Sequence, residues 1–324
     1  MRLRLVPETT AWNFFRPMRA AVALSVLGMV ASVLLFLFVG LNFGIDFRGG
    51  TTIRTESSVP VDVGAYRVAL APLALGDVAI SEVFDPTFGP EQNVTMVRIQ
   101  AQEGAESVTA ETILAIEEAL RAAVDPGMTF PSVESVGPKV SGELIQTAII
   151  AVVLSVAAVL VYIWLRFEWQ FAVGAVVALV HDVLLTIGIF SLFQIRFDLA
   201  IIAALLTIVG YSLNDTVVIF DRVRENLRKY KKIPLQEVIN ISLNETLSRT
   251  VLTSLTTLIA LIALLVLGGD VIRGFVFAMT WGIIVGTYST VFMACAILER
   301  LGVKRDWDTP TGGGAGTQFA NVDA

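Results

Sequence analysis

The sequence has little cysteine, histidine or charge, and each shortage excludes a class of protein. Cys295 is the single cysteine among 324 residues, so no disulfide can form within the chain. With one cysteine and one histidine, a zinc site built from these ligands is excluded. Charged residues make up 16%, whereas a soluble domain has about a quarter. The sequence also lacks a phosphate-binding glycine loop and a nucleophile elbow. We therefore expect no cofactor, no metal, no nucleic-acid partner and no enzymatic activity.

Long apolar runs dominate instead. The chain is 55% hydrophobic and its mean hydropathy is +0.74. Six runs are each close to the ~20 residues that cross a bilayer. The predicted transmembrane segments are residues 20–41, 144–165, 171–193, 199–220, 247–267 and 274–298. The first run is longer than the core of a signal peptide, about 7–15 residues, so we interpret it as an uncleaved helix. The fold class is a polytopic α-helical membrane protein.

The charges predict the orientation of these helices. Residues 42–143 hold fifteen Asp or Glu and six Arg or Lys, a local charge of −9, so the rest carries +3. Outside this region, fifteen basic residues fall on one side of the predicted membrane, and only Arg196 and Arg273 fall on the other. The positive-inside rule then places residues 1–19 and 299–324 in the cytoplasm and residues 42–143 outside. The Gly-rich tail is predicted to be disordered from about residue 309.

The region between the first two membrane segments has the pattern of a small α+β domain. Strand and helix periods alternate, with proline and glycine between them. The predicted elements are strand 51–55, helix 61–75, strand 78–84, strand 94–101, helix 109–124 and strand 129–136. This order is that of a ferredoxin-like domain, here on the outer side of the membrane.

Residues 221–246 form a predicted cytoplasmic connector. It begins with a basic cluster between Arg222 and Lys232, and apolar residues then recur at helical spacing from Leu235 to Leu243. This pattern favours an amphipathic helix on the inner membrane surface. It serves either as a simple connector or as a contact for a partner.

Asp215 is the principal candidate for function, because it interrupts the apolar run 199–220. A carboxylate inside a membrane is costly unless it is paired or hydrated, so such a residue suggests a functional site. At ~1.5 Å per residue it lies roughly 24 Å from Leu199, in the inner half of the membrane. Arg249 enters the next segment from the cytoplasmic side, and we expect the two to form an ion pair. The pair acts either as a proton switch or as a static link between helices.

Weaker candidates surround this pair. His181 and Asp182 lie in the third segment; adjacent residues point about 100° apart on a helix, so they need not bind each other. They form either a proton relay or ordinary contacts between helices. Ser212, Asn214 and Thr216 flank Asp215. Further hydroxyls that can line a wet path are Thr250, Thr253, Ser254, Thr256 and Thr257, and serine and threonine are also common packing residues between membrane helices. Cys295 is interpreted as packing.

Two glycine-containing motifs border the outer domain. In FGIDFRGGT, Gly44, Gly49 and Gly50 permit a tight exit from the membrane. Asp46 and Arg48 are predicted to form a local pair at the interface, with a functional role as the alternative. VGPKVSGEL stands at the re-entry to the membrane and contributes Gly137, Pro138 and Gly142, and its Ser141 is a candidate helix cap.

These segments carry a resemblance to a known family. FGIDFRGGT, VGPKVSGEL, HDV, GYSLNDTVVIFDRVREN and LSRT occur in this order across about residues 12–305. The chain in this respect resembles the SecF family, the smaller subunit of the SecD–SecF complex of bacterial protein export, within the RND superfamily. The resemblance implies six transmembrane helices, with a periplasmic domain after the first.

The resemblance also implies function and partners. SecF pairs with SecD as one half of a pseudo-symmetric unit beside the SecYEG channel of the inner membrane. The pair is thought to use the proton gradient to draw preproteins out at the periplasmic side. Asp215 matches the aspartate implicated in proton flow, and Arg249 the arginine proposed to gate it.

Two other functions are weighed against this hypothesis. One is half of an RND-type exporter of small molecules or lipids, which usually has twelve crossings in one chain and a larger periplasmic part. The other is a membrane scaffold that transports nothing and whose polar residues only hold a partner. Six crossings and a compact domain argue against the exporter, and an Asp215→Asn variant distinguishes the scaffold.

Overall fold

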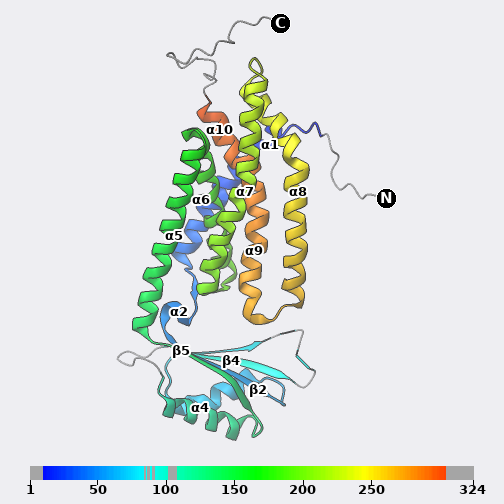
Figure 1. Ribbon diagram of the computed structural model, residues 1–324. Helices are drawn as coiled ribbons and strands as arrows, with labels where there is room; N and C mark the ends of the chain where they lie inside the picture. The colour runs from blue at the N-terminus through cyan, green and yellow to red at the C-terminus, as the bar shows by residue number, and fades with distance from the viewer. Residues whose placement is uncertain (1–9, 84, 86–87, 90–91, 101–107, 304–324) are drawn as a thin grey trace, which may run out of the picture.

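The computed structural model describes residues 10–83, 85, 88–89, 92–100 and 108–303, so the tail predicted to be disordered lies outside the described residues. It contains six helices long and apolar enough to cross a membrane, and an α+β domain at one end of the helical bundle (Figure 1). The helices are α1 (Phe15–Phe38), α5 (Pro138–Arg166), α6 (Trp169–Phe193), α7 (Leu199–Lys229), α8 (Leu235–Leu267) and the sixth, which comprises α9 (Asp270–Ser289), η2 (Thr290–Ala294) and α10 (Cys295–Leu301). The fold class of a six-helix membrane protein is confirmed.

Several helices extend beyond the apolar runs that predicted them. Helix α5 begins at Pro138, ahead of the predicted segment that starts at residue 144, and α7 continues through the charged residues to Lys229. Polar residues such as Arg, Lys and Glu are good helix formers, so a helix can continue beyond the end of its apolar run. The positions at which the helices cross the bilayer remain predictions.

The predicted surface connector differs from the structure. Residues 221–229 complete α7, and residues 235–246 are the first turns of α8, which runs unbroken into the membrane segment. The apolar stripe expected to lie on the membrane is buried inside the protein, where Val238, Ile239 and Leu243 pack with Phe14 and Leu227. The same amphipathic pattern suits a helix that packs on neighbouring helices, and the sequence does not distinguish the two.

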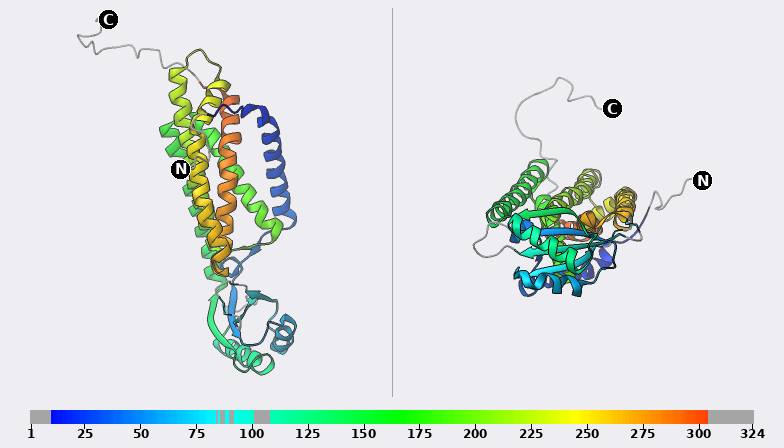
Figure 2. Two further views of the ribbon diagram at one scale, coloured as in Figure 1. Left: turned by 90° about the vertical axis from the view of Figure 1, so that its right-hand side faces the viewer. Right: turned by 90° about the horizontal axis from the view of Figure 1, so that it is seen from below.

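Small residues bring the membrane helices close together. A methyl group on Gly188 of α6 would collide with Ser32 of α1, and one on Gly282 of α9 would collide with Ile208 of α7. Close backbone approach is a principal source of packing energy between helices in lipid. Helix α7 packs on α6, α8 and α9. The α+β domain lies beyond one end of the bundle in the left view of Figure 2.

The α+β domain has the predicted β-α-β-β-α-β order. Its elements are β2 (Gly50–Ser57), α3 (Val63–Leu70) with the 3₁₀ turn η1 (Ala71–Leu73), β3 (Val78–Val83), β4 (Asn93–Gln100), α4 (Ala110–Ala123) and β5 (Thr129–Val136). The four strands pair antiparallel in the order β3-β4-β2-β5, which is the ferredoxin-like topology. The core lies between the sheet and the two helices and includes Ile53, Tyr66, Val97, Ile116 and Leu120. Figure 1 shows the sheet lying between α4 and the helical bundle.

Asp125 fixes the turn that follows α4. Its carboxylate accepts hydrogen bonds from the backbone N–H of Gly127, at 2.8 Å, and from both Ser57 and Ser58. These bonds favour the ionised carboxylate and lower the pKa of Asp125 to about 2, with the Gly127 bond contributing most. The carboxylate therefore ties the end of α4 to the end of β2.

Candidate functional site in the transmembrane bundle

Asp215 lies on α7 with its side chain turned into the bundle. Only 3% of its surface is exposed, and its Oδ2 atom has no hydrogen-bond partner within the described residues. Ser212 and Thr216, at positions i−3 and i+1, are buried on the same side of the helix. An acceptor without a donor is unfavourable in a medium of low polarity, so this carboxyl group is poised to gain a proton, a water molecule or a cation.

Arg249 forms no ion pair with Asp215 within the described residues. Its side chain is exposed on the outside of α8, while the next residue, Thr250, is buried. The expectation of a direct ion pair is therefore wrong for this conformation, because α8 is rotated so that the arginine points away from the interior.

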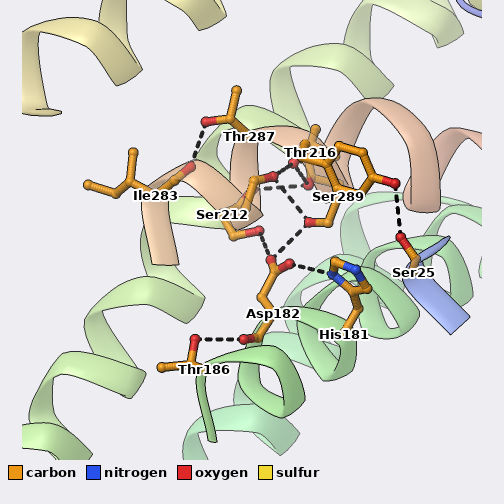
Figure 3. A network of polar contacts seen from close by, with 12 residues as sticks. Ser25, His181, Asp182, Thr186, Ser212, Thr216, Ile283, Thr287 and Ser289 are labelled. Atoms are coloured by element: carbon orange, nitrogen blue, oxygen red, sulfur yellow. Dashed lines mark hydrogen bonds and ion pairs between the residues drawn. The ribbon is translucent and has the colours of Figure 1, made fainter. Parts of the chain in front are cut away.

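A second carboxylate, Asp182, organises the interior of the bundle (Figure 3). It is fully buried on α6. Its Oδ2 accepts hydrogen bonds from Ser212 of α7 at 2.7 Å and from Ser289 of α9 at 2.9 Å, and Oδ1 lies 3.0 Å from Nδ1 of His181. One side chain thus joins three helices, and each of its oxygens has a partner.

His181 extends this network to α1. His181 forms a hydrogen bond with its neighbour Asp182, although the 100° between adjacent helical residues gave no reason to expect one. Its ring stacks on that of Tyr288, with centroids 6.1 Å apart. The Tyr288 hydroxyl donates to the carbonyl of Ala21 at 2.7 Å and accepts from Ser25 at 3.1 Å. Nε2 of His181 is buried and has no partner within the described residues.

Hydroxyl groups form a further layer beside Asp215. Thr216 and Thr290 lie 3.0 Å apart and connect α7 to η2, and Ser254 and Thr287 lie 2.7 Å apart and connect α8 to α9. Thr290 opens a single π-helical turn, and such turns occur often at functional sites. The buried surroundings of Asp215 are therefore polar on the side that faces α9.

Comparison with known proteins decides the family. The family model described as "Protein export membrane protein SecD/SecF, C-terminal" matches residues 115–304, and the "SecD/SecF GG Motif" matches residues 34–61. The protein translocase subunit SecF of Cereibacter sphaeroides is 62% identical over 323 residues, which cover 100% of this chain and 99% of that protein. The chain belongs to the SecF family.

Longer SecF relatives exist in which this chain corresponds to one part. The protein translocase subunit SecDF of Brucella abortus is 41% identical over 94% of this chain, which spans 39% of that protein. The crystal structure of SecDF from Thermus thermophilus, described as a translocon-associated membrane protein, superposes with a TM-score of 0.81 at 35% identity, over 93% of this chain and 40% of that one. This SecF chain is thus a multi-pass membrane protein and an accessory subunit of the Sec protein translocase.

The structure brings together only part of the predicted site. His181, Asp182, Ser212 and Thr216 share one buried network. Asp215 lies next to it on α7 without a hydrogen bond to it within the described residues. Asn214 and Arg249 instead point outward from SecF.

Sequence reasoning missed the contribution of α9 and η2. Ser289 and Thr290 bond Asp182 and Thr216, and Tyr288 carries the link to α1. One signal was available, because residues 287–290 form an unbroken polar run inside the last apolar segment of this SecF.

The GG motif of this SecF reaches the start of α7. Strand β1 (Asn42–Phe43) pairs with β6 (Arg196–Phe197), and the short helix α2 (Ile45–Arg48) follows. Asp46 Oδ2 accepts from the backbone N–H of Leu199 at 3.0 Å, in place of the predicted pair with Arg48. It adds a second carboxylate to the start of α7, beside the N-cap residue Asp198, which accepts from the backbone N–H of Ile201. A carboxylate suits this position, because a helix N-terminus carries positive partial charge.

The glycines of the two motifs differ in role. Gly49 and Gly50 have φ angles of +71° and +131°, which allow the chain to turn into β2. Gly44 is the N-cap residue that precedes α2. Gly137 precedes α5 and Pro138 is its first residue, which is a favourable place for proline. Ser141 lies inside that helix and is not its cap, contrary to expectation. Gly142 has open space around it.

Proposed function

We propose that this accessory subunit uses the proton motive force to promote preprotein translocation and release at the periplasmic side, with Asp215 as the proton carrier and Arg249 as the gate. The observation that carries the proposal is the buried Asp215 carboxyl group, whose Oδ2 has no partner within the described residues. Asp182 is the contrasting case, because its oxygens are bonded.

The proton cycle follows from the cost of charge inside a membrane. When Arg249 lies outside, the ionised form of Asp215 has no direct counter-ion and the protonated form is favoured. When Arg249 turns inward or water enters, ionisation becomes less costly and the proton leaves. One charge that crosses 100 mV yields about 2.3 kcal/mol, which is enough to bias such a two-state element.

SecD is the proposed direct partner, and the outer face of α7 and α8 supports it. Thr207, Gly210 and Asn214 are exposed along α7, and Arg249 is exposed on α8. Hydrocarbon offers no hydrogen-bond partner to an amide or a guanidinium group, so we expect this face to contact protein or water rather than lipid. The relatives in which SecF forms part of a SecDF chain support the same partner.

The wider assembly follows from the charge pattern and the family. We place both termini in the cytoplasm and the α+β domain in the periplasm of a bacterial inner membrane, because the basic residues gather at the end of the bundle opposite the domain. The remaining proposed partners are the SecYEG translocon and the emerging preprotein, which the periplasmic domain would meet.

Substitution of Arg249 tests the gate. With Arg249→Ala, export driven by the proton gradient should fall to the level measured without a gradient, and Arg249→Lys should give an intermediate level, because lysine keeps the charge but loses the planar fork. The measurement is preprotein translocation into membrane vesicles, with and without an uncoupler. Arg222→Lys on α7 is the matched control and should export normally. Equal rates for Ala, Lys and Arg at position 249 would remove the gate from the mechanism.

Substitution of Gly210 tests the partner face. Gly210 is exposed, and nothing lies within 4 Å of an added Cβ, so Gly210→Leu leaves this fold intact and strengthens the helix. The new bulk should overpack the contact with SecD, which costs about 1–3 kcal/mol, and weaken the binding of SecD by about 5- to 150-fold, measured by co-purification. Ala31→Leu, at an exposed position of α1, is the control. Undiminished co-purification would place SecD on another face.

A further inference from the structure

A charged cavity lies between the ends of α5 and α7, at the end of the bundle remote from the α+β domain. It measures about 510 Å³. Its lining consists of charged residues, namely Arg166, Asp221, Arg224, Glu225, Arg228 and Lys229. Figure 1 shows the ends of both helices on the side opposite the sheet. Neither the proton site nor the proposed SecD face includes these residues.

The cavity wall carries excess positive charge. Its lining has four cationic and two anionic residues. The carboxylate of Glu225 bonds Arg222, which lies outside the wall, at 2.7 Å, and Arg222 also holds Glu245. Asp221 bonds Arg166 at 3.0 Å. Within the described residues, Arg224 and Lys229 of the wall form no ion pair with a carboxylate.

The two helices hold this wall in place. Arg224 Nη1 lies 3.4 Å from the carbonyl oxygen of Arg166, and the Arg166–Asp221 ion pair also joins α5 to α7. The Nζ atom of Lys229 lies 4.9 Å from the ring centroid of Tyr230, which limits its freedom. Contacts between two helices therefore hold the wall of the cavity in place, and its cations are not independent surface side chains.

Aromatic residues place the cavity at the membrane surface. Tyr162, Trp164 and Trp169 are 56%, 65% and 54% exposed around the end of α5. Tryptophan and tyrosine concentrate at the boundary between lipid and water. Further along α5, Val153 and Leu154 are also more than half exposed, so an apolar helix face leads away from the cavity into the membrane.

We propose that this cavity binds the phosphate of an anionic phospholipid whose acyl chains lie along the exposed face of α5. Arginine and lysine side chains bind phosphate oxygens through charge-assisted hydrogen bonds, and basic pockets between membrane helices suit anionic headgroups. Arg224 and Lys229 supply the charge from α7, and Arg166, which is paired with Asp221, forms the α5 side of the wall. A soluble acidic ligand would explain the basic wall, but not the aromatic rim and the apolar path beside it.

The first test measures lipid retention by the purified complex. The complex is exchanged into nanodiscs that contain either phosphatidylglycerol or phosphatidylcholine, and retained lipid is counted by native mass spectrometry after release into detergent. We expect retention of phosphatidylglycerol only. In the variant Arg224→Gln with Lys229→Gln, retention should fall about 30-fold, because each charge lost at a membrane surface reduces binding about fivefold.

A matched variant and two competitors give the outcomes that would overturn the proposal. Lys231→Gln with Lys232→Gln removes the same charge outside the cavity wall and should retain the lipid. An equal loss in both variants would mean that the basic surface attracts lipid without a specific site. Retention of phosphatidylcholine would refute the charge argument. Displacement of the lipid by inorganic phosphate alone would reassign the cavity to a soluble anion.

A second measurement uses the unaltered protein and so does not depend on how the variants fold. A photoactivatable phosphatidylglycerol with its reactive group near the phosphate is cross-linked in nanodiscs, and the peptides are identified by mass spectrometry. Cross-links should concentrate on residues 161–169 and 224–230. Cross-links spread evenly around the bundle, or absent from these two stretches, would refute the site.

Discussion

Asp215→Asn is expected to abolish the part of protein export that depends on the proton gradient, while the subunit folds and assembles normally. Asparagine has the size of aspartate and can accept a hydrogen bond, but it cannot bind and release a proton at physiological pH. Because Oδ2 of Asp215 has no partner to lose within the described residues, the substitution removes little that stabilises the fold. The expected defect is therefore confined to function.

The measurement is preprotein translocation in vesicles whose proton gradient is set and then collapsed with an uncoupler. The wild type should slow when the gradient collapses, and the Asn variant should show the slow rate throughout. Asp215→Glu keeps a titratable group and should restore part of the difference. Membrane abundance and SecD co-purification serve as controls for assembly. If the Asn variant shows gradient-dependent export at the wild-type rate, Asp215 is not the proton carrier, and the scaffold hypothesis is favoured.

Asp182→Ala should produce the opposite pattern, with a large loss of stability. It removes an acceptor shared by Ser212, Ser289 and His181. Loss of one partner from a buried, charge-assisted network typically costs about 3–5 kcal/mol, because the remaining groups stay buried. Ser212→Ala and Ser289→Ala each delete one hydrogen bond between helices, which averages about 0.6 kcal/mol in membranes.

Thermal unfolding in detergent, together with membrane abundance, measures this effect. The expected order of stability is wild type, then either serine variant, then Asp182→Asn, and last Asp182→Ala. A double-mutant cycle of Asp182 and Ser289 should show coupling, because the two side chains bond directly. If Asp182→Ala unfolds like the wild type yet loses gradient-dependent export, the carboxylate belongs to the proton path and not to the framework.

The sequence predicts the elements of this fold better than their contacts. Six apolar runs identify six helices, because lipid imposes a minimum length on any helix that crosses it. Periods of two and 3.6 residues similarly place the strands and helices of the outer domain, and its ferredoxin-like order follows from their succession. Asp215 stands out because an acidic residue within an apolar run is costly wherever the helix packs.

The rotation of each helix about its own axis is what the sequence does not supply. Arg249 and Asp215 come to similar depths, yet the arginine faces outward, since the packing of α8 on α9 decides its direction. Asp46 finds its partner at Leu199, far along the chain, rather than at Arg48 nearby. Both contacts depend on tertiary packing, which a pattern along one chain does not encode.

The cap that Asp46 places on α7 has a mechanical consequence. The GG motif joins α1 to the α+β domain. Through the hydrogen bond from the backbone N–H of Leu199 to Asp46, it also contacts the first residue of α7, the helix that carries Asp215. A hydrogen-bonded helix is stiff along its axis, and Asp215 lies about 24 Å from Leu199 on the same helix. A tilt of the α+β domain would therefore displace the start of α7, and Asp215 would move with it as part of the same stiff helix.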